Sequence, residues 1–155
     1  MEQKEAKKCN QAWAKATRKR IEISQYQSLL DKYSYMFKHK VTGCMDAPFA
    51  LFGFECGEGW FDIIKKLCSQ IDELLTKKDK KSFRVIQVKE KFGTLRFYTS
   101  FITNEIEKAI NEAEKLSGET CESCGAKGTM RNRYDWLMVR CDKCWEKENK
   151  SRRVN

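Results

Sequence analysis

Four cysteines near the carboxyl end of the chain have the spacing needed to bind a metal ion. They form two Cys-x2-Cys pairs, and sixteen residues separate the first pair from the second. Two such pairs supply four thiolates, which close a tetrahedron around Zn²⁺ and leave no open position for a substrate. The spacing therefore predicts one structural zinc ion and disfavours catalytic zinc. The predicted ligands are Cys121, Cys124, Cys141 and Cys144.

The segment between the two cysteine pairs is predicted to form a β-hairpin. Residues 129–134 and 136–141 are rich in strand-forming types, and 132–135 supply a turn. Two cysteine knuckles that bracket a hairpin are typical of a zinc ribbon, which we expect over 118–146. A redox dithiol or unligated cysteines are the alternative interpretations.

The other four cysteines do not repeat this pattern. Cys44, Cys56 and Cys68 are evenly spaced along the sequence. His39 lies nearby, but Cys68 falls on the apolar stripe of a predicted helix, where cysteine behaves as a small hydrophobic residue. Cys9 stands alone among charged residues. We therefore predict buried or unligated thiols here rather than a second metal site.

Basic and aromatic residues lie together on the ribbon hairpin, a combination typical of nucleic-acid binding. Guanidinium groups pair with phosphates, and aromatic rings stack on bases. The alternative is that the rings pack the ribbon onto the rest of the protein while the arginines form a solvated rim. Zinc ribbons also serve as protein-docking modules. The predicted nucleic-acid contacts are Arg131, Arg133, Tyr134, Trp136 and Arg140.

Charge is distributed unevenly along the chain. The formal net charge of the 155 residues is +9, of which 1–40 carry +6, 41–120 carry −1 and 121–155 carry +4. The pattern predicts a nearly neutral body between two basic ends, so attraction to polyanions is expected at the ends. The predicted units are a basic arm or helix over 1–21, an α+β body over 22–117, and a zinc ribbon with a basic tail over 118–155.

Three helices are predicted in the body, because apolar residues recur there at helical spacing. The expected helices cover 22–38, 61–76 and 105–117. Asn104 and Glu107 stand in the register of a capping box at the start of the last helix, and Gly118 fits its carboxyl-terminal cap.

One β-hairpin is predicted over 83–99, with its turn at 89–94 around Gly93. The apolar stretch 49–54 is expected to form a short buried segment, and the lysine-rich run 77–81 a solvated turn. These elements together predict an α+β fold: a small helical body packed on a β-hairpin, followed by a carboxyl-terminal four-cysteine zinc ribbon.

Two short motifs in the body combine charged, aromatic and glycine residues. The first, at 55–60, is a glycine loop before a helix, in which we expect Glu58 to cap the helix and Trp60 to pack beneath it. The second, at 88–98, places three cations beside aromatic rings and resembles the wall of an anion pocket. The alternative is a hairpin with its rings in the core and its charges in solvent. The candidate ligand or partner site is Glu58, Trp60, Lys89, Lys91, Arg96 and Tyr98.

The sequence offers little for an enzyme mechanism. The only histidine is His39, and no nucleophile accompanies Glu55 and Glu58 in the glycine loop. That loop also lacks the Gly-Lys-Ser/Thr sequence of a P-loop. No apolar run approaches the roughly 20 residues of a membrane span, and the charged first residues do not resemble a secretory signal. We therefore expect a non-enzymatic cytoplasmic protein without a membrane partner.

Three motifs together resemble a group of small, mostly uncharacterised phage and prophage proteins. They are ECGEGWF at 55–61, QVKEKFGTLRFY at 87–98 and CESCG at 121–125. The resemblance implies a phage-encoded accessory protein in a bacterial host cytoplasm, and it carries over no catalytic residue. It also implies a second class of function, because small accessory phage proteins often block a host defence protein or sequester a nucleotide signal.

The function predicted first is therefore that of a non-enzymatic zinc-ribbon protein that binds nucleic acid through its ribbon. The alternative is an anti-defence or regulatory protein whose α+β body binds a host protein or sequesters a nucleotide ligand.

Overall fold

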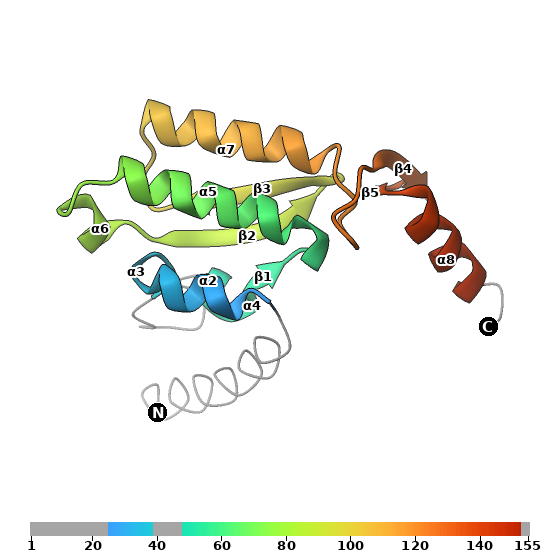
Figure 1. The fold of residues 1–155 in the computed structure, drawn as a ribbon, viewed down its shortest axis with the longest axis horizontal. Helices are drawn as coiled ribbons and strands as arrows, with labels where there is room; N and C mark the ends of the chain where they lie inside the picture. Colours follow the sequence, from blue (N-terminus) through green and yellow to red (C-terminus); the bar gives the residue numbers. More distant parts are fainter. Residues whose placement is uncertain (1–24, 39–47, 153–155) are drawn as a thin grey trace, which may run out of the picture.

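The computed structural model describes residues 25–38 and 48–152 of the chain (Figure 1). The predicted amino-terminal arm over 1–21 lies outside these residues, as do Cys9, His39 and Cys44. The described part is an α+β fold with two separate sheets, as the sequence predicts. A three-stranded sheet belongs to the body, and a two-stranded sheet belongs to the ribbon.

The sheet of the body is built on the predicted hairpin. Strands β2 (Val85–Lys91) and β3 (Thr94–Thr99) pair antiparallel, and the two-residue strand β1 (Phe54–Glu55) pairs parallel with β2. The turn is shorter than the predicted 89–94, because β2 continues through Lys91. Phe92 and Gly93 form it with φ values of 54° and 82°, the left-handed pair that a two-residue hairpin turn requires.

Two amphipathic helices cover one face of this sheet. Helix α5 (Phe61–Leu74) crosses that face, and α7 (Asn104–Ser117) lies beside α5 along β3 (Figure 1). Both predicted helices are confirmed, although α5 ends at Leu74, two residues before the predicted end. Leu74 itself is exposed, whereas the other apolar residues along this side of α5 are buried or partly buried. The amino-terminal cap of α7 is Thr103 rather than the predicted Asn104, because the Thr103 side chain accepts the hydrogen bond from the Ile106 amide. Gly118 is its carboxyl-terminal cap, as predicted.

The region before the sheet contains shorter elements than predicted. The expected helix over 22–38 is interrupted, within the described residues, at Tyr33, which separates α2 (Gln27–Lys32) from α3 (Ser34–Phe37). After this break the Tyr35 hydroxyl donates to the Asp72 carboxylate at 2.7 Å, which joins α3 to α5. The side chains of Tyr33, Met36 and Phe37 remain buried in the core.

Two further segments differ in detail from the prediction. The buried segment expected at 49–54 becomes a short helix, α4 (Pro48–Phe52), and the beginning of β1. The lysine-rich run at 77–81 leads into the one-turn helix α6 (Asp79–Ser82) instead of forming only a turn. Thr76 and Asp79 exchange hydrogen bonds there, which favours this extra helical turn.

The ribbon contains the predicted hairpin and one helix that was not predicted. Strands β4 (Thr129–Arg133) and β5 (Trp136–Arg140) pair antiparallel, and Tyr134 and Asp135 form the turn with φ values of 51° and 64°. The segment predicted as a basic tail instead forms helix α8 (Asp142–Arg152).

The glycine loop holds the ribbon against the body. The Gly59 amide donates to the Glu122 carbonyl oxygen at 2.8 Å, and the Gly57 amide donates to the Glu122 carboxylate at 2.9 Å. The fully buried Trp60 donates from its indole nitrogen to the Thr120 carbonyl at 2.9 Å. Trp60 thus packs beneath the loop, as predicted.

The prediction that Glu58 caps α5 is wrong. Glu58 begins the short 3₁₀ helix η1 (Glu58–Trp60), and neither η1 nor α5 has a side-chain cap hydrogen bond. The Glu58 carbonyl oxygen instead accepts from the Gln25 side chain at 2.8 Å. The loop therefore gains its order from contacts with the ribbon and the first helices rather than from a cap.

Both glycines of this loop are required by close packing. A Cβ atom on Gly57 would lie 2.3 Å from the Glu122 carbonyl oxygen, and one on Gly59 would lie 2.2 Å from the Cys121 carbonyl oxygen. Neither backbone atom can move without displacing the cysteine knuckle. The glycines of this motif are therefore explained by the approach of the ribbon.

Gly59→Ala should lower the free energy of unfolding by about 3 kcal/mol or more, because the added methyl group collides with backbone atoms of the knuckle. Gly118→Ala is the matched control, because its φ is −67° and its nearest contact would be 3.3 Å. It should change stability by less than about 1 kcal/mol. Urea unfolding of the metal-loaded proteins measures both values, and equal losses would contradict the docking role of Gly59.

Candidate metal centre

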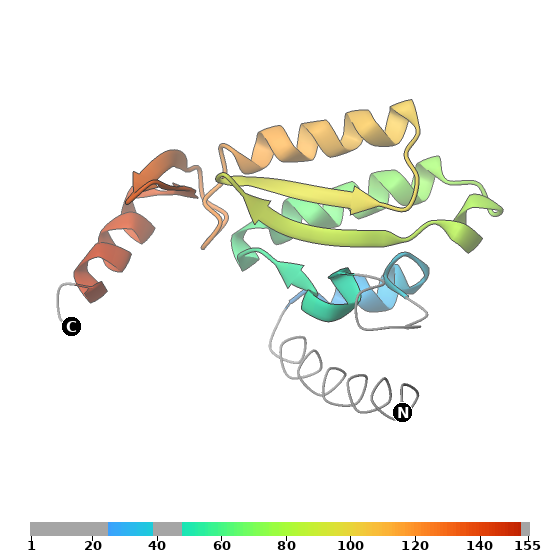
Figure 2. The ribbon, with the colours of Figure 1, turned by 180° about the vertical axis from the view of Figure 1, so that it is seen from behind.

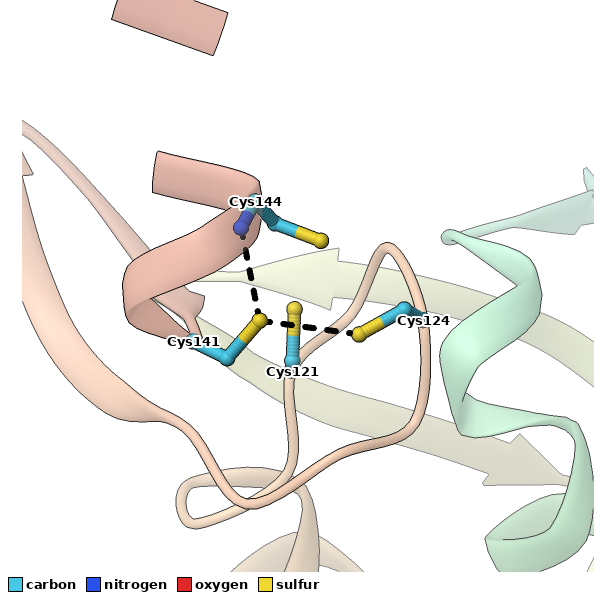
Figure 3. A group of neighbouring side chains, drawn as sticks. All are labelled: Cys121, Cys124, Cys141 and Cys144. Atoms are coloured by element: carbon cyan, nitrogen blue, oxygen red, sulfur yellow. Dashed lines mark hydrogen bonds between the residues drawn. The ribbon is translucent and has the colours of Figure 1, made fainter. Parts of the chain in front are cut away.

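The four predicted ligands come together at one end of the ribbon. Cys121 and Cys124 lie in the loop after α7, Cys141 follows β5, and Cys144 lies in the first turn of α8. Their four Sγ atoms all lie within 4.8 Å of one another, and their side chains converge between the loop and α8 (Figure 3).

Backbone hydrogen bonds shape the first knuckle. The Cys121 amide donates to the Ala126 carbonyl at 2.7 Å, and the Gly125 amide donates to the Cys121 carbonyl at 2.8 Å. Gly125 has a φ of 78°, which a residue with a side chain rarely adopts. A tight loop is therefore fixed around the first two sulfur atoms.

The start of α8 shapes the second knuckle. The Cys144 amide donates to the Sγ atom of Cys141 at 3.4 Å (Figure 3), and this hydrogen bond lowers the pKa of the Cys141 thiol to about 7. The deprotonated thiol is the form that binds metals.

The arrangement fits a single metal ion. In a tetrahedral site with metal–sulfur bonds of about 2.3 Å, neighbouring sulfur atoms lie about 3.8 Å apart. The Sγ atoms of Cys124 and Cys141 are 3.6 Å apart, and all four cysteines are free of disulfides. Four protein ligands complete the coordination, so such a centre would stabilise the fold rather than bind a substrate.

Glu122 connects the metal knuckle to both neighbouring parts of the protein. Its carboxylate accepts from the Gly57 amide and also from the Arg140 guanidinium at 3.0 Å. Arg140 in turn contacts Glu148 of α8 at 2.7 Å. A continuous polar chain therefore runs from the glycine loop through the knuckle to α8.

The three arginines predicted to contact nucleic acid all have partners within the ribbon. Arg131 forms an ion pair with Asp142, and Arg133 donates to Asn149 at 2.7 Å. The Arg133 guanidinium lies 4.2 Å from the centroid of the Trp145 ring, and its side chain is 8% exposed. These contacts, with those of Arg140, hold α8 against the hairpin.

Tyr134 and Trp136, the two aromatic residues predicted to contact nucleic acid, are exposed, unlike the paired arginines. Tyr134 is 94% exposed and Trp136 is 63% exposed, both at the turn of the ribbon hairpin. Neither ring packs the ribbon onto the body. The structure therefore separates the five predicted contact residues into three internally paired arginines and two exposed rings.

A row of lysines lies on α8, outside the set of predicted contact residues. Lys143, Lys147 and Lys150 are spaced by four and three residues, so they share one side of the helix, and all three are exposed. None of them forms an ion pair with any residue that the structure describes. The spacing is visible in the sequence, but it places the three lysines on one side only if residues 142–152 form a helix.

The candidate site in the body is only partly assembled. Lys89, Lys91, Arg96 and Tyr98 lie on the face of the sheet opposite α5, where Lys89 and Arg96 are cross-strand neighbours. Trp60 is buried beneath the glycine loop, and Glu58 is exposed in that loop. The six residues do not converge on one pocket.

Two of the four remaining cysteines lie in described regions. Cys68 is fully buried on α5, and Cys56 lies beside the Tyr26 hydroxyl, with 3.8 Å between the oxygen and the sulfur. Burial raises the pKa of each thiol to about 12. Among the described residues, only the ribbon cysteines form a group able to hold a metal ion.

Comparisons with known proteins add no family to this description: no family model, no curated protein and no solved structure matches the chain. Within 25–38 and 48–152, no helix has the length and apolar character needed to cross a membrane.

Cys56 and Cys68 should resist alkylation by iodoacetamide at pH 8, because a thiol with a pKa of about 12 is almost entirely protonated there. Mass spectrometry of tryptic peptides should find both unmodified in folded protein and modified after unfolding in urea. Rapid labelling of Cys68 in the folded protein would contradict the burial of this side chain in the core.

Proposed function

We propose that this chain is a non-enzymatic zinc-ribbon protein that binds nucleic acid through the ribbon. The metal is proposed to be Zn²⁺, because four thiolates in a compact group suit its preference for tetrahedral sulfur coordination. One ion would be held by the four ribbon cysteines. Its role would be structural: it would fix the two knuckles and so position the hairpin and α8.

Two observations on the ribbon carry this proposal: the exposed rings at the hairpin turn, and a row of lysines without ion-pair partners on the side of α8 away from the hairpin. Arg133, adjacent to the hairpin turn, donates to Asn149, so Tyr134 and Trp136 lie at the same end of the ribbon as the second half of α8. Rings of this kind stack on bases, and lysines attract phosphates without a fixed geometry. The lysine row of α8, rather than the paired arginines, would supply the phosphate contacts.

The paired arginines would act by positioning the contacts. A phosphate that approached Arg133 would have to displace the Asn149 amide and the Trp145 ring, and one that approached Arg140 would have to displace two carboxylates. Both side chains are also largely buried, at 8% and 15% exposure. Their removal would therefore loosen α8 before it removed any contact to nucleic acid.

The cellular setting is part of the same proposal. The resemblance of the motifs at 55–61, 87–98 and 121–125 to small phage proteins supports an accessory protein in a bacterial cytoplasm. The structure is compatible with that setting in one respect, namely the clustering of free thiols as a metal site rather than as disulfides.

Purified protein should contain one zinc ion per chain by elemental analysis. Cys124→Ser should lose most of the metal, because three thiolates and a hydroxyl bind zinc weakly, whereas Cys68→Ala should keep it. Cobalt substitution should give the absorption bands of tetrahedral thiolate coordination. Protein without metal, or with equal metal in both variants, would contradict a four-cysteine zinc site.

Nucleic-acid binding should depend on the lysine row of α8. Reversing the charge of Lys143, Lys147 and Lys150 to glutamate should weaken binding at 50 mM salt by at least about tenfold. The slope of log affinity against log salt should also fall by about one for each phosphate that is no longer neutralised. Fluorescence anisotropy with labelled oligonucleotides measures both quantities.

The control for that experiment reverses three lysines at the opposite end of the molecule. Lys77, Lys78 and Lys81 are exposed and lie near α6, far from the ribbon (Figure 1). Their replacement by glutamate changes the net charge by the same amount and should weaken binding much less. Equal losses in the two triple variants would show that only net charge matters, and the ribbon would not be the binding site.

A further inference from the structure

The sheet of the body has one face that no described helix covers. In Figure 2, α5 lies behind the strands and α7 runs alongside β3, and the opposite face of β2 and β3 is turned toward the viewer. We call this the open face. Its side chains, by strand register and alternating burial, are Glu55, Gln87, Lys89, Lys91, Thr94, Arg96 and Tyr98.

The open face is basic. Lys89 and Lys91 lie two residues apart on β2, so both point to the same side, and neither forms an ion pair with a described residue. Arg96 lies opposite Lys89 on β3 and contacts Glu114 of α7 at 2.5 Å. Glu55, the one carboxylate of the face, accepts from the Gln87 amide group at 2.9 Å.

Exposed rings accompany these cations. Tyr98 is 44% exposed on β3, and Phe92 is 67% exposed at the turn that joins the two strands. The Lys91 ammonium group lies 5.3 Å from the centroid of the Phe92 ring. Aromatic side chains that sit on or beside an exposed sheet are suited to stacking on unpaired bases.

The open face ends next to the ribbon. A Cβ atom on Gly93 would lie 2.5 Å from the sulfur of Met130, so the turn of the body hairpin packs directly on β4. In Figure 2 the ribbon lies at the turn end of β2 and β3. A nucleic-acid strand bound to the ribbon would therefore have a basic and aromatic surface of the body beside it.

We infer that the open face is a second nucleic-acid surface and that it takes single-stranded DNA or RNA. The inference rests on the proposed function of the ribbon and names the class of nucleic acid. A duplex keeps its bases stacked inside and offers no base faces to Tyr98 or Phe92. The sheet also offers no helix to enter a groove. A single strand presents phosphates to Lys89 and Lys91 and bases to the rings.

The test compares the two surfaces with a labelled 20-nucleotide single strand and its duplex, as DNA and as RNA. Wild-type protein should bind the single strand at least about tenfold more tightly than the duplex. The double variant Lys89→Glu/Lys91→Glu should weaken single-strand binding by about tenfold or more, whereas Lys77→Glu/Lys78→Glu should not.

The ring contribution is tested separately. Tyr98→Ala should weaken single-strand binding by about fivefold or more, and Tyr98→Phe should bind as wild type, because the stacking ring is retained. Photocrosslinking of the wild-type protein to an oligonucleotide that contains 5-iodouracil should label the peptide with Tyr98. This readout does not depend on the stability of any variant.

The possible results distinguish the proposed function of the ribbon from the inference about the open face. If wild type binds neither single strands nor duplexes, both the proposed function and the inference fail. If only the α8 variants lose binding and Tyr98 is not crosslinked, the ribbon remains a binding site and the open face does not. Equal affinity for duplex and single strand overturns the inference. Retention of nucleic-acid binding by the sheet variants also overturns it, and leaves a protein partner as the occupant of the face.

Discussion

The contact between the glycine loop and the first cysteine knuckle positions most of what this protein presents to a partner. Two backbone amides and one indole nitrogen of the loop donate to the segment 120–122, at distances of 2.8 to 2.9 Å. The approach is so close that Gly57 and Gly59 leave no room for a side chain. Glu122 then extends the contact through Arg140 to α8. The orientation of the ribbon thus depends on a few backbone atoms.

This arrangement also changes how the basic charge of the ribbon is understood. Residues 121–155 carry a formal charge of +4, and three of their cations are the hairpin arginines. Those arginines are paired with carboxylates, an amide or the Trp145 ring, so they organise α8 against the hairpin. The lysines of α8 are among the cations of this segment that form no ion pair with a described residue. Composition therefore shows that this segment is basic, and the structure adds that its hairpin arginines are paired whereas the α8 lysines form no ion pair with a described residue.

The sequence was sufficient for features that repeat at a fixed period or follow a fixed spacing. The Cys-x2-Cys pairs, the apolar stripes of α5 and α7, and both hairpins were all predictable, because each depends on residues close in the chain. The first residue of a helix was harder to predict where two adjacent residues can both act as its cap. Thr103 and Asn104 are both good caps, and only the geometry of the first turn shows that Thr103 accepts the hydrogen bond.

Features that depend on distant contacts could not be predicted from local patterns. Helix α8 has no apolar stripe, and it is held by the stacking of Arg133 on Trp145 and by the ion pairs of Glu148. In the sequence, Gly57 and Gly59 indicate only a loop before a helix. Glycine is needed at both positions because Glu122 and Cys121, more than sixty residues away in the chain, pack against them.

The central claim is that the metal knuckle and the glycine loop form one cooperative unit. Hydrogen–deuterium exchange, measured by mass spectrometry with the metal bound and after its removal by a chelator, tests it most directly. On this account, the peptide that contains Gly57–Trp60 should lose protection together with the knuckle peptide, while the peptide over Val85–Lys91 keeps most of its protection. Unchanged protection at Gly57–Trp60 after the knuckle has unfolded would contradict the account.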